Sequence, residues 1–418
     1  MSYTTIKGFR DILPQETPLW QRVENEAREL LGVFGYKEIR TPVLEKTELF
    51  SRTIGEDTDI VSKEMYTFQD TKGRSLSLRP EATASVARAY IQNRLYHEAG
   101  AHKFFTIGPM FRHERPQKGR YRQFHQINAE LFKDPGPRSD ADVVLLAMTL
   151  MERIGLKGLS LHLNSIGCNE CRPVFKEKLR DYLQGVSGGL CSDCQRRAST
   201  NPLRVFDCKV DSCKGAMAQA PKILDFLCKA CGIHFQSLRD YLEALNISYT
   251  IDPNLVRGLD YYNRTTFEIQ SQGLGAQNAV LGGGRYDGLL KQLGGPDEPA
   301  IGFAVGMERV IMLLSEFTEP VQSGPALFIA SLGPEAEKKA LLWAAALRKG
   351  GIWVELDYTP GGLKAQMRRA DRMGARKVLI VGEDELESGY AILRDMTTKE
   401  QQKIQIQGII ETLKEVLS

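Results

Sequence analysis

The sequence predicts an α+β protein of several domains, in which mixed strands and helices are interrupted by a mostly helical, cysteine-rich segment and followed by an α/β domain. Three observations support this fold class. The 418 residues exceed what a single hydrophobic core usually serves. All eight cysteines lie between Cys168 and Cys231. Beyond residue 325, apolar strand patterns alternate with amphipathic helix patterns.

The composition is that of an ordinary globular protein, with 42% hydrophobic and 26% charged residues. A formal net charge of +3 is close to neutral, so any contact with nucleic acid must come from local basic patches. The first 15 residues lack the apolar core of a signal peptide, and the most apolar stretch, Val143–Met151, is too short to span a bilayer. We therefore expect a cytoplasmic protein without membrane contact.

The N-terminal elements follow from apolar spacing and from prolines. Helical spacing covers Pro18–Phe34 and ends at Gly35, and Tyr36–Glu45 then has the pattern of a strand whose proline suits an edge or a bend. A further strand ends at Pro80, before a helix predicted over Ala82–Leu95. Glu81 either stabilises the N-terminus of that helix as a carboxylate or binds an ammonium group.

A basic hairpin is the most informative stretch, because Phe111–Gln126 contains five Lys and Arg residues and joins two strand patterns through a loop. In the second strand, period-two alternation separates a polar face from a face that suits a core. An arginine, Arg112, lies on the partner strand, close to the polar face. Such a surface suits ATP and a small polar substrate, whereas the alternative is a solvated hairpin. The polar face carries Phe124, Gln126, Asn128 and Glu130, and the apolar face carries His125, Ile127, Ala129 and Leu131.

The cysteine-rich segment has helical patterns over Pro173–Leu183, Pro221–Phe226 and Phe235–Leu245. In a cytoplasmic chain, clustered cysteines indicate metal ligands or inert buried thiols and not a disulfide framework. The spacing Cys-x₂-Cys-x₁₉-Cys-x₂-Cys is typical of a structural zinc site. The candidate ligands are Cys168, Cys171, Cys191 and Cys194, with further close pairs at Cys208 and Cys213 and at Cys228 and Cys231.

Strand patterns return over Ile247–Ser271 and include Leu255–Tyr262, where an arginine and two tyrosines surround a glycine. These residues either pack as a plain hairpin or frame a polar pocket. After the glycine-rich stretch 281–288, an apolar strand runs into a helix with Arg309 in its first turn. The helix dipole disfavours a cation there, so we expect Arg309 to have a partner, the alternative being an exposed arginine. The common P-loop, dinucleotide-binding and zinc-protease motifs are absent.

A domain boundary is expected near 319–325. The following α/β domain is predicted to contain a largely parallel sheet. Its predicted elements are the strand Ala326–Ala330, the helix Glu335–Lys349, the strand Trp353–Asp357, the helix Leu363–Met373 and the strand Lys377–Val381.

Several of these segments together resemble the class II aminoacyl-tRNA synthetases. Arg40–Pro42 with Glu45 is similar to motif 1, Phe111–Gln126 to motif 2, and Gly306–Arg309 to motif 3. Leu255–Tyr262, together with 283–287, narrows the resemblance to the histidyl-tRNA synthetase family. The resemblance covers nearly the whole chain and includes its opening residues 7–11.

The resemblance implies a class II catalytic domain with an antiparallel sheet flanked by helices, formed by residues 1–167 and 247–320. It also implies a cysteine-rich insertion over 168–246 and an anticodon-binding domain over 325–418. The implied activity is the activation of L-histidine with ATP and Mg²⁺ to histidyl-adenylate, followed by transfer to the 3′ end of tRNA(His). A homodimer is implied because motif 1 is an interface element in this class. The alternatives are a non-catalytic regulatory subunit of a histidine-biosynthetic ATP phosphoribosyltransferase, and a ligase for another amino acid.

The resemblance also implies a role for each candidate residue. The catalytic residues would be Arg112, Arg257 and Gln126. Histidine would be bound by Glu81, Ala82, Thr83, Arg112, Gln126, Glu130, Arg257, Tyr261 and Tyr262. ATP would be bound by Arg112, Glu114, Phe124 and Arg309, and tRNA by Gln117, Lys118, Arg120, Arg122, Arg368, Arg369 and Arg372. Many members of the family lack the cysteines, so the resemblance does not imply zinc and the spacing alone favours it.

Overall fold

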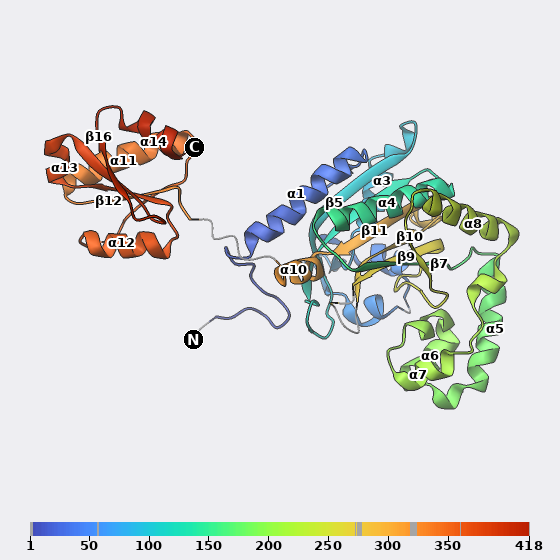
Figure 1. Cartoon of the computed structure of the whole chain (residues 1–418). Coiled ribbons are helices and arrows are strands. Elements are labelled where there is room, and N and C mark those ends of the chain that lie inside the picture. The colour runs from blue at the N-terminus through green and yellow to red at the C-terminus, as the bar shows by residue number, and fades with distance from the viewer. Residues whose placement is uncertain are drawn as a thin grey trace. The chain divides into compact units, whose positions relative to one another are not determined.

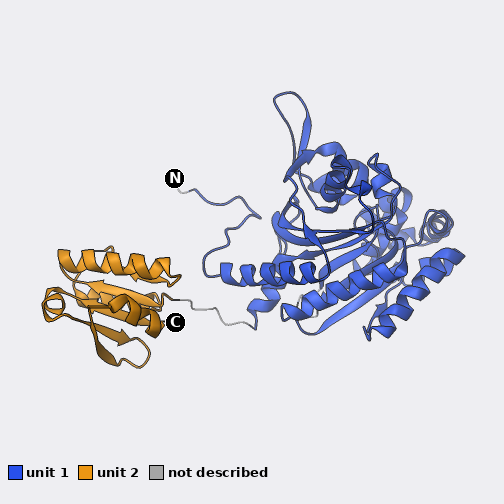
Figure 2. Cartoon of the chain, turned by 90° about the horizontal axis from the view of Figure 1, so that it is seen from above, with its two compact units in different colours: residues 1–319 blue, residues 320–418 orange. Residues whose placement is uncertain are grey.

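The computed structural model describes residues 3–56, 58–271, 273, 278–317, 324–359 and 361–417. The chain forms two compact units, Met1–Glu319 and Pro320–Ser418 (Figure 2). The boundary predicted near 319–325 falls mostly outside the described residues. Within the described ranges, no helix has both the length and the apolar character needed to cross a membrane.

Unit 1 is built on a mixed sheet whose centre is antiparallel (Figure 1). Among the described residues it has eight strands, in the order β1-β5-β6-β11-β10-β9-β7-β8, and only the two edge pairings, β1 with β5 and β7 with β8, are parallel. Their bounds are β1 Lys37–Glu38, β5 His102–Phe111, β6 Gln123–Phe132, β7 Leu159–Ser165, β8 Thr250–Ile251, β9 Asn263–Ser271, β10 Ala279–Arg285 and β11 Ala300–Gly306.

Helices cover one face of this sheet and bury the main hydrophobic core. The core takes Ile127, Ala129 and Leu131 from β6, so the apolar face predicted for this strand is confirmed. The covering helices are α1 Thr17–Val33, α4 Pro137–Arg153, α8 Lys229–Ala244 and α10 Met307–Ser315. The polar face of β6 lies on the opposite side of the sheet, because successive strand side chains point to opposite faces.

A second, smaller sheet accompanies the first and corrects one prediction. The strand predicted over Tyr36–Glu45 is two strands in different sheets, because Pro42 between them has no N–H for a continuous ladder. The small sheet has the order β2-β4-β3, with β2 Leu44–Lys46, β3 Thr67–Gln69 and β4 Ser75–Leu78. Nearby lie α2 Thr47–Ile54, a π-helical turn Ile60–Glu64, α3 Thr83–Gln92, a 3₁₀ turn Leu95–His97 and α9 Leu289–Gln292.

The cysteine-rich segment forms a lobe of short helices beside the sheet (Figure 1). Its small core is separate from the main core and includes Phe175 and Leu179. Helix α8 is different, since its buried side chains pack into the main core of unit 1. The helix predicted over Pro221–Phe226 is a 3₁₀ turn. The lobe contains α5 Cys171–Gly185, α6 Ser192–Thr200, α7 Asp211–Met217 and the 3₁₀ turns Ser187–Gly189, Pro202–Asp207 and Ile223–Phe226.

Unit 2 has a sheet with the order β13-β12-β14-β15-β16. The prediction of a largely parallel sheet is wrong for its second half, because β14, β15 and β16 pair antiparallel. The strands β15 and β16 form a hairpin, and the polar sequence of β16 gives little strand signal. The elements are β12 Leu327–Ser331, α11 Pro334–Lys349, β13 Val354–Leu356, α12 Leu363–Arg372, β14 Lys377–Val381, α13 Glu383–Ser388, β15 Tyr390–Asp395, β16 Gln401–Gln405 and α14 Ile409–Leu417.

A buried ion pair fixes the end of β10 to helix α4. Arg285 and Asp140 are both fully buried and form a salt bridge. Arg285 also donates to the carbonyl oxygen of Asp134 at 2.8 Å, and His234 Nε2 lies 2.8 Å from the Asp140 carboxylate. Burial opposes the ionisation of Asp140, but Arg285 and His234 together outweigh it and lower the pKa of this carboxyl. The pair therefore joins β10, α4 and α8 inside unit 1.

We expect Arg285→Met to lower the free energy of unfolding by about 3–5 kcal/mol, because it leaves the Asp140 carboxylate buried without its cation. Chemical denaturation monitored by circular dichroism measures the loss. Lys291→Met is the matched control, because Lys291 pairs with Asp297 at 2.7 Å in an exposed position and such pairs contribute about 0–1 kcal/mol. Equal losses in the two variants would contradict this account of the network.

Candidate active site

The floor of the candidate site is made of glycines in β10 and β11. Gly282 and Gly284 of β10 are paired across the sheet with Ala304 and Gly302 of β11. A Cβ atom at Gly282 would overlap the guanidinium of Arg257, and one at Gly302 would overlap the carboxylate of Glu130. The missing side chains therefore create the space in which these two polar groups lie over the sheet.

Arg257 lies over this floor and is held by a carboxylate from β9. Its Nη1 donates to Oε2 of Glu268 at 2.6 Å. Burial disfavours the charged guanidinium, but Glu268, Tyr262, Asp207 and Tyr261 together outweigh burial and raise the pKa of Arg257. The Nε of Arg257 is buried and has no hydrogen-bond partner within the described part of the chain. The guanidinium thus keeps a donor for an incoming anion.

Glu130 occupies the opposite side of the floor. Its carboxylate accepts a hydrogen bond from Thr83 Oγ1 at 2.7 Å and another from the hydroxyl of Tyr286. Burial raises the pKa of Glu130 to about 8, although both hydroxyls act in the opposite direction. The ring of Tyr286 lies 5.6 Å from that of Tyr261 and 6.4 Å from that of Tyr262. A carboxyl group and three phenol rings therefore form one buried cluster.

Glu81 performs the structural role predicted for it. Its carboxylate accepts the backbone N–H groups of Thr83 at 2.7 Å and Ala84 at 2.9 Å, at the N-terminus of α3. Burial raises its pKa, and these two hydrogen bonds counteract the rise. The hydroxyl of Tyr261 lies 3.5 Å from the same carboxylate, so Glu81 is adjacent to the cluster of Glu130 and the three tyrosines. Its predicted contact with an ammonium group stays a prediction.

The polar face of β6 continues the site toward Arg112. The guanidinium of Arg112 lies 5.2 Å from the ring centre of Phe124, and its Nε donates to the carbonyl oxygen of Pro80 at 2.8 Å. On the same face, Gln126 Oε1 and Asn128 Oδ1 are buried without a hydrogen-bond partner among the described residues. A ligand with several N–H groups would satisfy both oxygens.

Arg309 and the loop between β5 and β6 add positive charge beside Arg112. Arg309 Nη1 donates to the carbonyl oxygen of Ala279, which is the partner expected from the sequence. Burial, followed by the neighbouring Arg120, lowers the pKa of Arg309 to about 10. Glu114 pairs with Arg120 at 2.9 Å. Because these arginines repel one another, the cluster suits a polyanion.

The candidate tRNA residues differ in how freely they are presented. Lys118 is 77% exposed at the tip of the loop, and Gln117 is also exposed. Arg122 instead donates to the carbonyl oxygens of Glu114 and Lys7, both at 3.3 Å, and so anchors the N-terminal segment.

The same difference holds in unit 2. Arg369 donates to the Asp357 carboxylate at 2.6 Å, whereas Arg368 and Arg372 are exposed. Arg369 is therefore partly engaged within its own unit, and the other two arginines are free to meet a phosphate.

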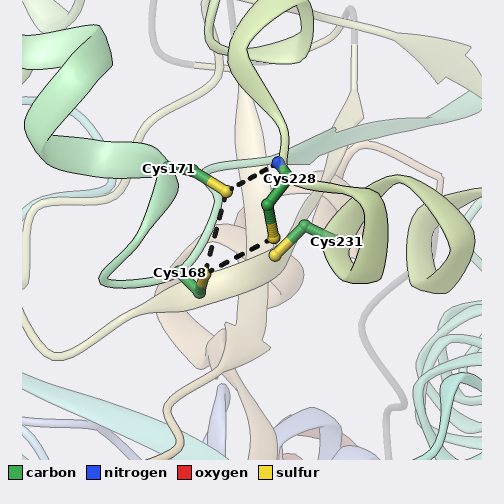
Figure 3. Close-up of side chains that lie close together, drawn as sticks. All are labelled: Cys168, Cys171, Cys228 and Cys231. Carbon is green, nitrogen blue, oxygen red and sulfur yellow. Dashed lines mark hydrogen bonds between the residues drawn. The ribbon is translucent and has the colours of Figure 1, made fainter.

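The structure corrects the grouping of the cysteines. The sequence predicted Cys168, Cys171, Cys191 and Cys194 as one set, but these two pairs belong to different clusters. The first pair faces two cysteines at the start of α8, and Figure 3 shows the four side chains pointing toward one another. Pairing by closeness in sequence failed because the chain returns from a distance. The clusters are Cys168, Cys171, Cys228 and Cys231, and Cys191, Cys194, Cys208 and Cys213.

Sequence reasoning missed four residues that support the site. Glu268 and Tyr286 hold Arg257 and Glu130, and Tyr286 lay within the quoted stretch 283–287. The other two come from the lobe: Arg172 donates to the carbonyl oxygen of Tyr262, and Arg204 to that of Arg257 at 3.1 Å. Both arginines line a cavity of about 110 Å³, which Arg257 and Tyr262 also line. No local signal marks residues so distant in the sequence.

Comparison with known proteins extends over almost the whole chain. A family model described as histidyl-tRNA synthetase matches residues 8–171 and 200–310, and a model of an anticodon binding domain matches 326–416. A histidine–tRNA ligase of Desulfosudis oleivorans is 55% identical over 96% of this chain and 95% of its own length. One from Halothermothrix orenii is 46% identical over 98% of this chain and 99% of its own.

Solved structures agree with these relatives. The apo histidyl-tRNA synthetase of Staphylococcus aureus superposes with a TM-score of 0.83 at 37% identity, over 99% of this chain and all of the other. A Bacillus halodurans structure described as an ATP phosphoribosyltransferase regulatory subunit/histidyl-tRNA synthetase has a TM-score of 0.67 over 91% of this chain and 99% of the other. At 20% identity it supports the fold alone. By its near full-length matches, the chain belongs to the histidyl-tRNA synthetase family.

Proposed function

We propose that the chain is a histidine–tRNA ligase, which joins L-histidine to ATP and passes the histidyl group to the 3′ end of tRNA(His). The observation that carries this proposal is the convergence of Arg112, Arg257 and Glu130 on one face of the sheet. Arg112 and Glu130 belong to one hairpin, and Arg257 reaches the same floor from a segment far along the chain.

Histidine would be held over the glycine floor. Glu130 and Tyr262 would bind opposite imidazole nitrogens, with Tyr261 lining the pocket and Tyr286 orienting Glu130. The ammonium group would meet Glu81, Thr83 and Gln126, beside Ala82. The unpartnered oxygen of Gln126 supports this role, because an ammonium supplies the missing donor. A substrate without imidazole would leave the Glu130 carboxyl without its ligand partner. Such a loss can lower kcat/KM relative to that for histidine by about 10⁴–10⁵-fold.

Activation would be an in-line attack of a histidine carboxylate oxygen on the α-phosphorus of ATP, with pyrophosphate leaving. Positioning and charge stabilisation supply the catalysis, since no covalent step on the protein is needed. Arg257 would bind the substrate carboxylate, and Arg112 would contact both that group and the α-phosphate. The adenine would stack between Phe124 and Arg309. Arg112 now covers Phe124, so ATP binding would turn its guanidinium from the ring toward the phosphate.

Two metals belong to this proposal. Mg²⁺ would accompany ATP and neutralise the β- and γ-phosphates. Glu114, whose side chain is 15% exposed among the arginines, offers the carboxylate oxygen that Mg²⁺ prefers. Structural zinc in the cysteine-rich segment, residues 168–246, would take no part in the chemistry.

The tRNA would be contacted in two places. The family recognises an extra guanine at the 5′ end of its tRNA, and Gln117 and Arg122 would read it. Lys118 and Arg120 would approach the acceptor end beside them, and Gln117 and Lys118 are the exposed members of the four. In the anticodon-binding domain, residues 325–418, Arg368 and Arg372 present free guanidinium groups for phosphate contact, with Arg369 beside them. The catalytic domain would comprise 1–167 and 247–320.

A homodimer through the motif 1 region is also part of the proposal. In this region Val43, Leu44 and Phe68 are 40%, 37% and 47% exposed. These apolar side chains belong to the small sheet or lie directly beside it, so they form a surface that a second copy would cover.

Histidine-dependent exchange between ATP and labelled pyrophosphate tests the function directly. We expect exchange with histidine and none with the other standard amino acids. Better exchange with another amino acid would overturn the pocket assignment. An absence of exchange, together with binding to an ATP phosphoribosyltransferase, would establish the regulatory alternative instead.

Removing the guanidinium over the floor tests the catalytic assignment. We expect Arg257→Ala to lower kcat/KM for histidine in the exchange reaction by about 10²–10³-fold, because a preorganised anion donor is lost. Arg239→Ala is the control, because the side chain of Arg239 donates to Tyr249 and Gln236, which are not part of the candidate site. An Arg257→Ala enzyme with unchanged kcat/KM would exclude the proposed role.

The raised pKa of Glu130 has a consequence for stability. Its carboxyl stays protonated in the folded chain up to about pH 8, whereas in the unfolded chain it ionises near 4.5. The free energy of unfolding, taken relative to that of Glu130→Gln, is therefore greatest below pH 4.5. It falls by up to about 1.4 kcal/mol per pH unit as the pH rises toward 8. Denaturation of both proteins across this range measures the difference, and a constant difference would mean that Glu130 titrates normally.

The apolar surface gives a test of assembly. We expect the native chain to sediment as a dimer at micromolar concentration and Phe68→Glu to sediment as a monomer, because a charge would be buried in the interface. Val174→Glu is the control, since Val174 is 52% exposed in the lobe. A stable, active monomer of the native chain would count against the dimer.

A further inference from the structure

We propose that the chain binds two structural zinc ions, one in each cysteine cluster. We also propose that both ions position the histidine-binding segment, Arg257–Tyr262, through arginines of the cysteine-rich segment. The proximal quartet is Cys168, Cys171, Cys228 and Cys231, and the distal quartet is Cys191, Cys194, Cys208 and Cys213. The ions themselves do not depend on the proposed function, whereas their effect on histidine binding rests on it.

The sulfur separations in both quartets match a tetrahedral zinc site. All four sulfur atoms of each quartet lie within 4.8 Å of one another. Cys168 Sγ lies 3.7 Å from Cys171 Sγ and 3.9 Å from Cys228 Sγ, and a distal pair is also 3.9 Å apart. Zinc–sulfur bonds of about 2.3 Å in a tetrahedron place sulfurs about 3.8 Å apart. A disulfide needs about 2.05 Å, so the quartets have the geometry of ion sites and not of disulfides.

The backbone around the sulfurs favours their thiolate form. The N–H of Cys228 donates to Cys171 Sγ at 3.1 Å, and that of Glu170 to Cys168 Sγ at 3.4 Å. In the distal quartet the N–H of Cys191 donates to Cys213 Sγ at 3.1 Å. Such hydrogen bonds stabilise the ligand charge and fix the direction of each sulfur.

Charge neutralisation is provided beside each quartet. A zinc ion with four thiolates has a net charge of −2, which needs nearby cations when it is partly buried. Arg172 directly follows Cys171 at the start of α5, and Arg197 lies one helical turn after Cys194 on α6. Each quartet therefore has a guanidinium group in its immediate neighbourhood.

The lobe has little else to hold it together. Its helices α6 and α7 have nine and seven residues, which is too short for stability in isolation. Cys194 and Cys213 are fully buried inside its small hydrophobic core. Domains with so small a core commonly depend on a metal or on disulfides. The distal ion would therefore take the place of a larger core.

Each quartet is adjacent to an arginine that grips the histidine-binding segment. In the proximal site, Arg172 follows Cys171 and donates to the carbonyl oxygen of Tyr262. Around the distal site, Arg204 lies on the 3₁₀ turn that runs into Cys208 and donates to the carbonyl oxygen of Arg257. The two arginines thus hold the two ends of the segment Arg257–Tyr262, so they act as positioning residues.

Metal analysis of the full-length protein, purified without added zinc or chelator, tests the proposal. We expect two zinc ions per chain, one in Cys168→Ser, one in Cys208→Ser and none in the double variant. Cys168→His and Cys208→His are the matched controls, because imidazole also binds zinc and should restore the second ion. One ion or none in the native protein, or disulfides found within the quartets by mass spectrometry, would overturn it.

The effect on the histidine segment has its own measurements. We expect loss of either ion to raise KM for histidine in pyrophosphate exchange by about 10-fold, with KM for ATP little changed. Cys168→His and Cys208→His, which still bind zinc, should keep KM for histidine near that of the native protein. If the serine variants do not fold, chelation of the native protein supplies the metal-free form, in which trypsin should cut within 171–231. An unchanged KM and unchanged proteolysis after zinc release would refute the positioning role while leaving the ligase assignment intact.

Discussion

The candidate site depends on the absence of side chains from the middle of one sheet face. Gly282 and Gly302 leave room above β10 and β11, because a side chain at either position would overlap Arg257 or Glu130. On the reverse face the same strands carry packed apolar residues such as Phe303. Glu130 projects from a hydrogen-bonded strand, whereas Arg257 comes from the segment between β8 and β9 and is fixed over the strands by Glu268. The sheet therefore positions both groups, one directly and one through an ion pair.

Charge is the second constraint, and it is distributed by burial. Arg285 and Asp140 are fully enclosed and satisfy each other, so they contribute order and no reactivity. Arg257 is held by Glu268 but retains one free donor direction, and Arg309 lies in a repelling group of arginines. The first pair suits a structural role, and the latter two residues suit an anionic ligand. The protein itself fills the hydrogen-bonding positions of Arg285 and Asp140, whereas the Nε of Arg257 has no partner among the described residues.

Local patterns predicted much of the fold. Alternation placed Ile127 in the core and Glu130 on the opposite face, and the α/β alternation of unit 2 was readable up to residue 381. The failures share a cause, which is pairing between distant segments. Strand β16 carries a polar pattern and pairs with β15, the supporting residue Tyr286 contacts Glu130 across 156 residues, and Cys168 contacts Cys228 across 60. A single sequence contains no direct record of such contacts.

The edges of the large sheet have a further consequence. Its outermost strands, β1 and β8, have two residues each, so they expose very few unpaired backbone groups. A long edge strand would be a template for strands from neighbouring molecules, and edge strands of two residues offer little length for such pairing. Short edge strands of this kind are one of the means by which proteins limit association between sheets.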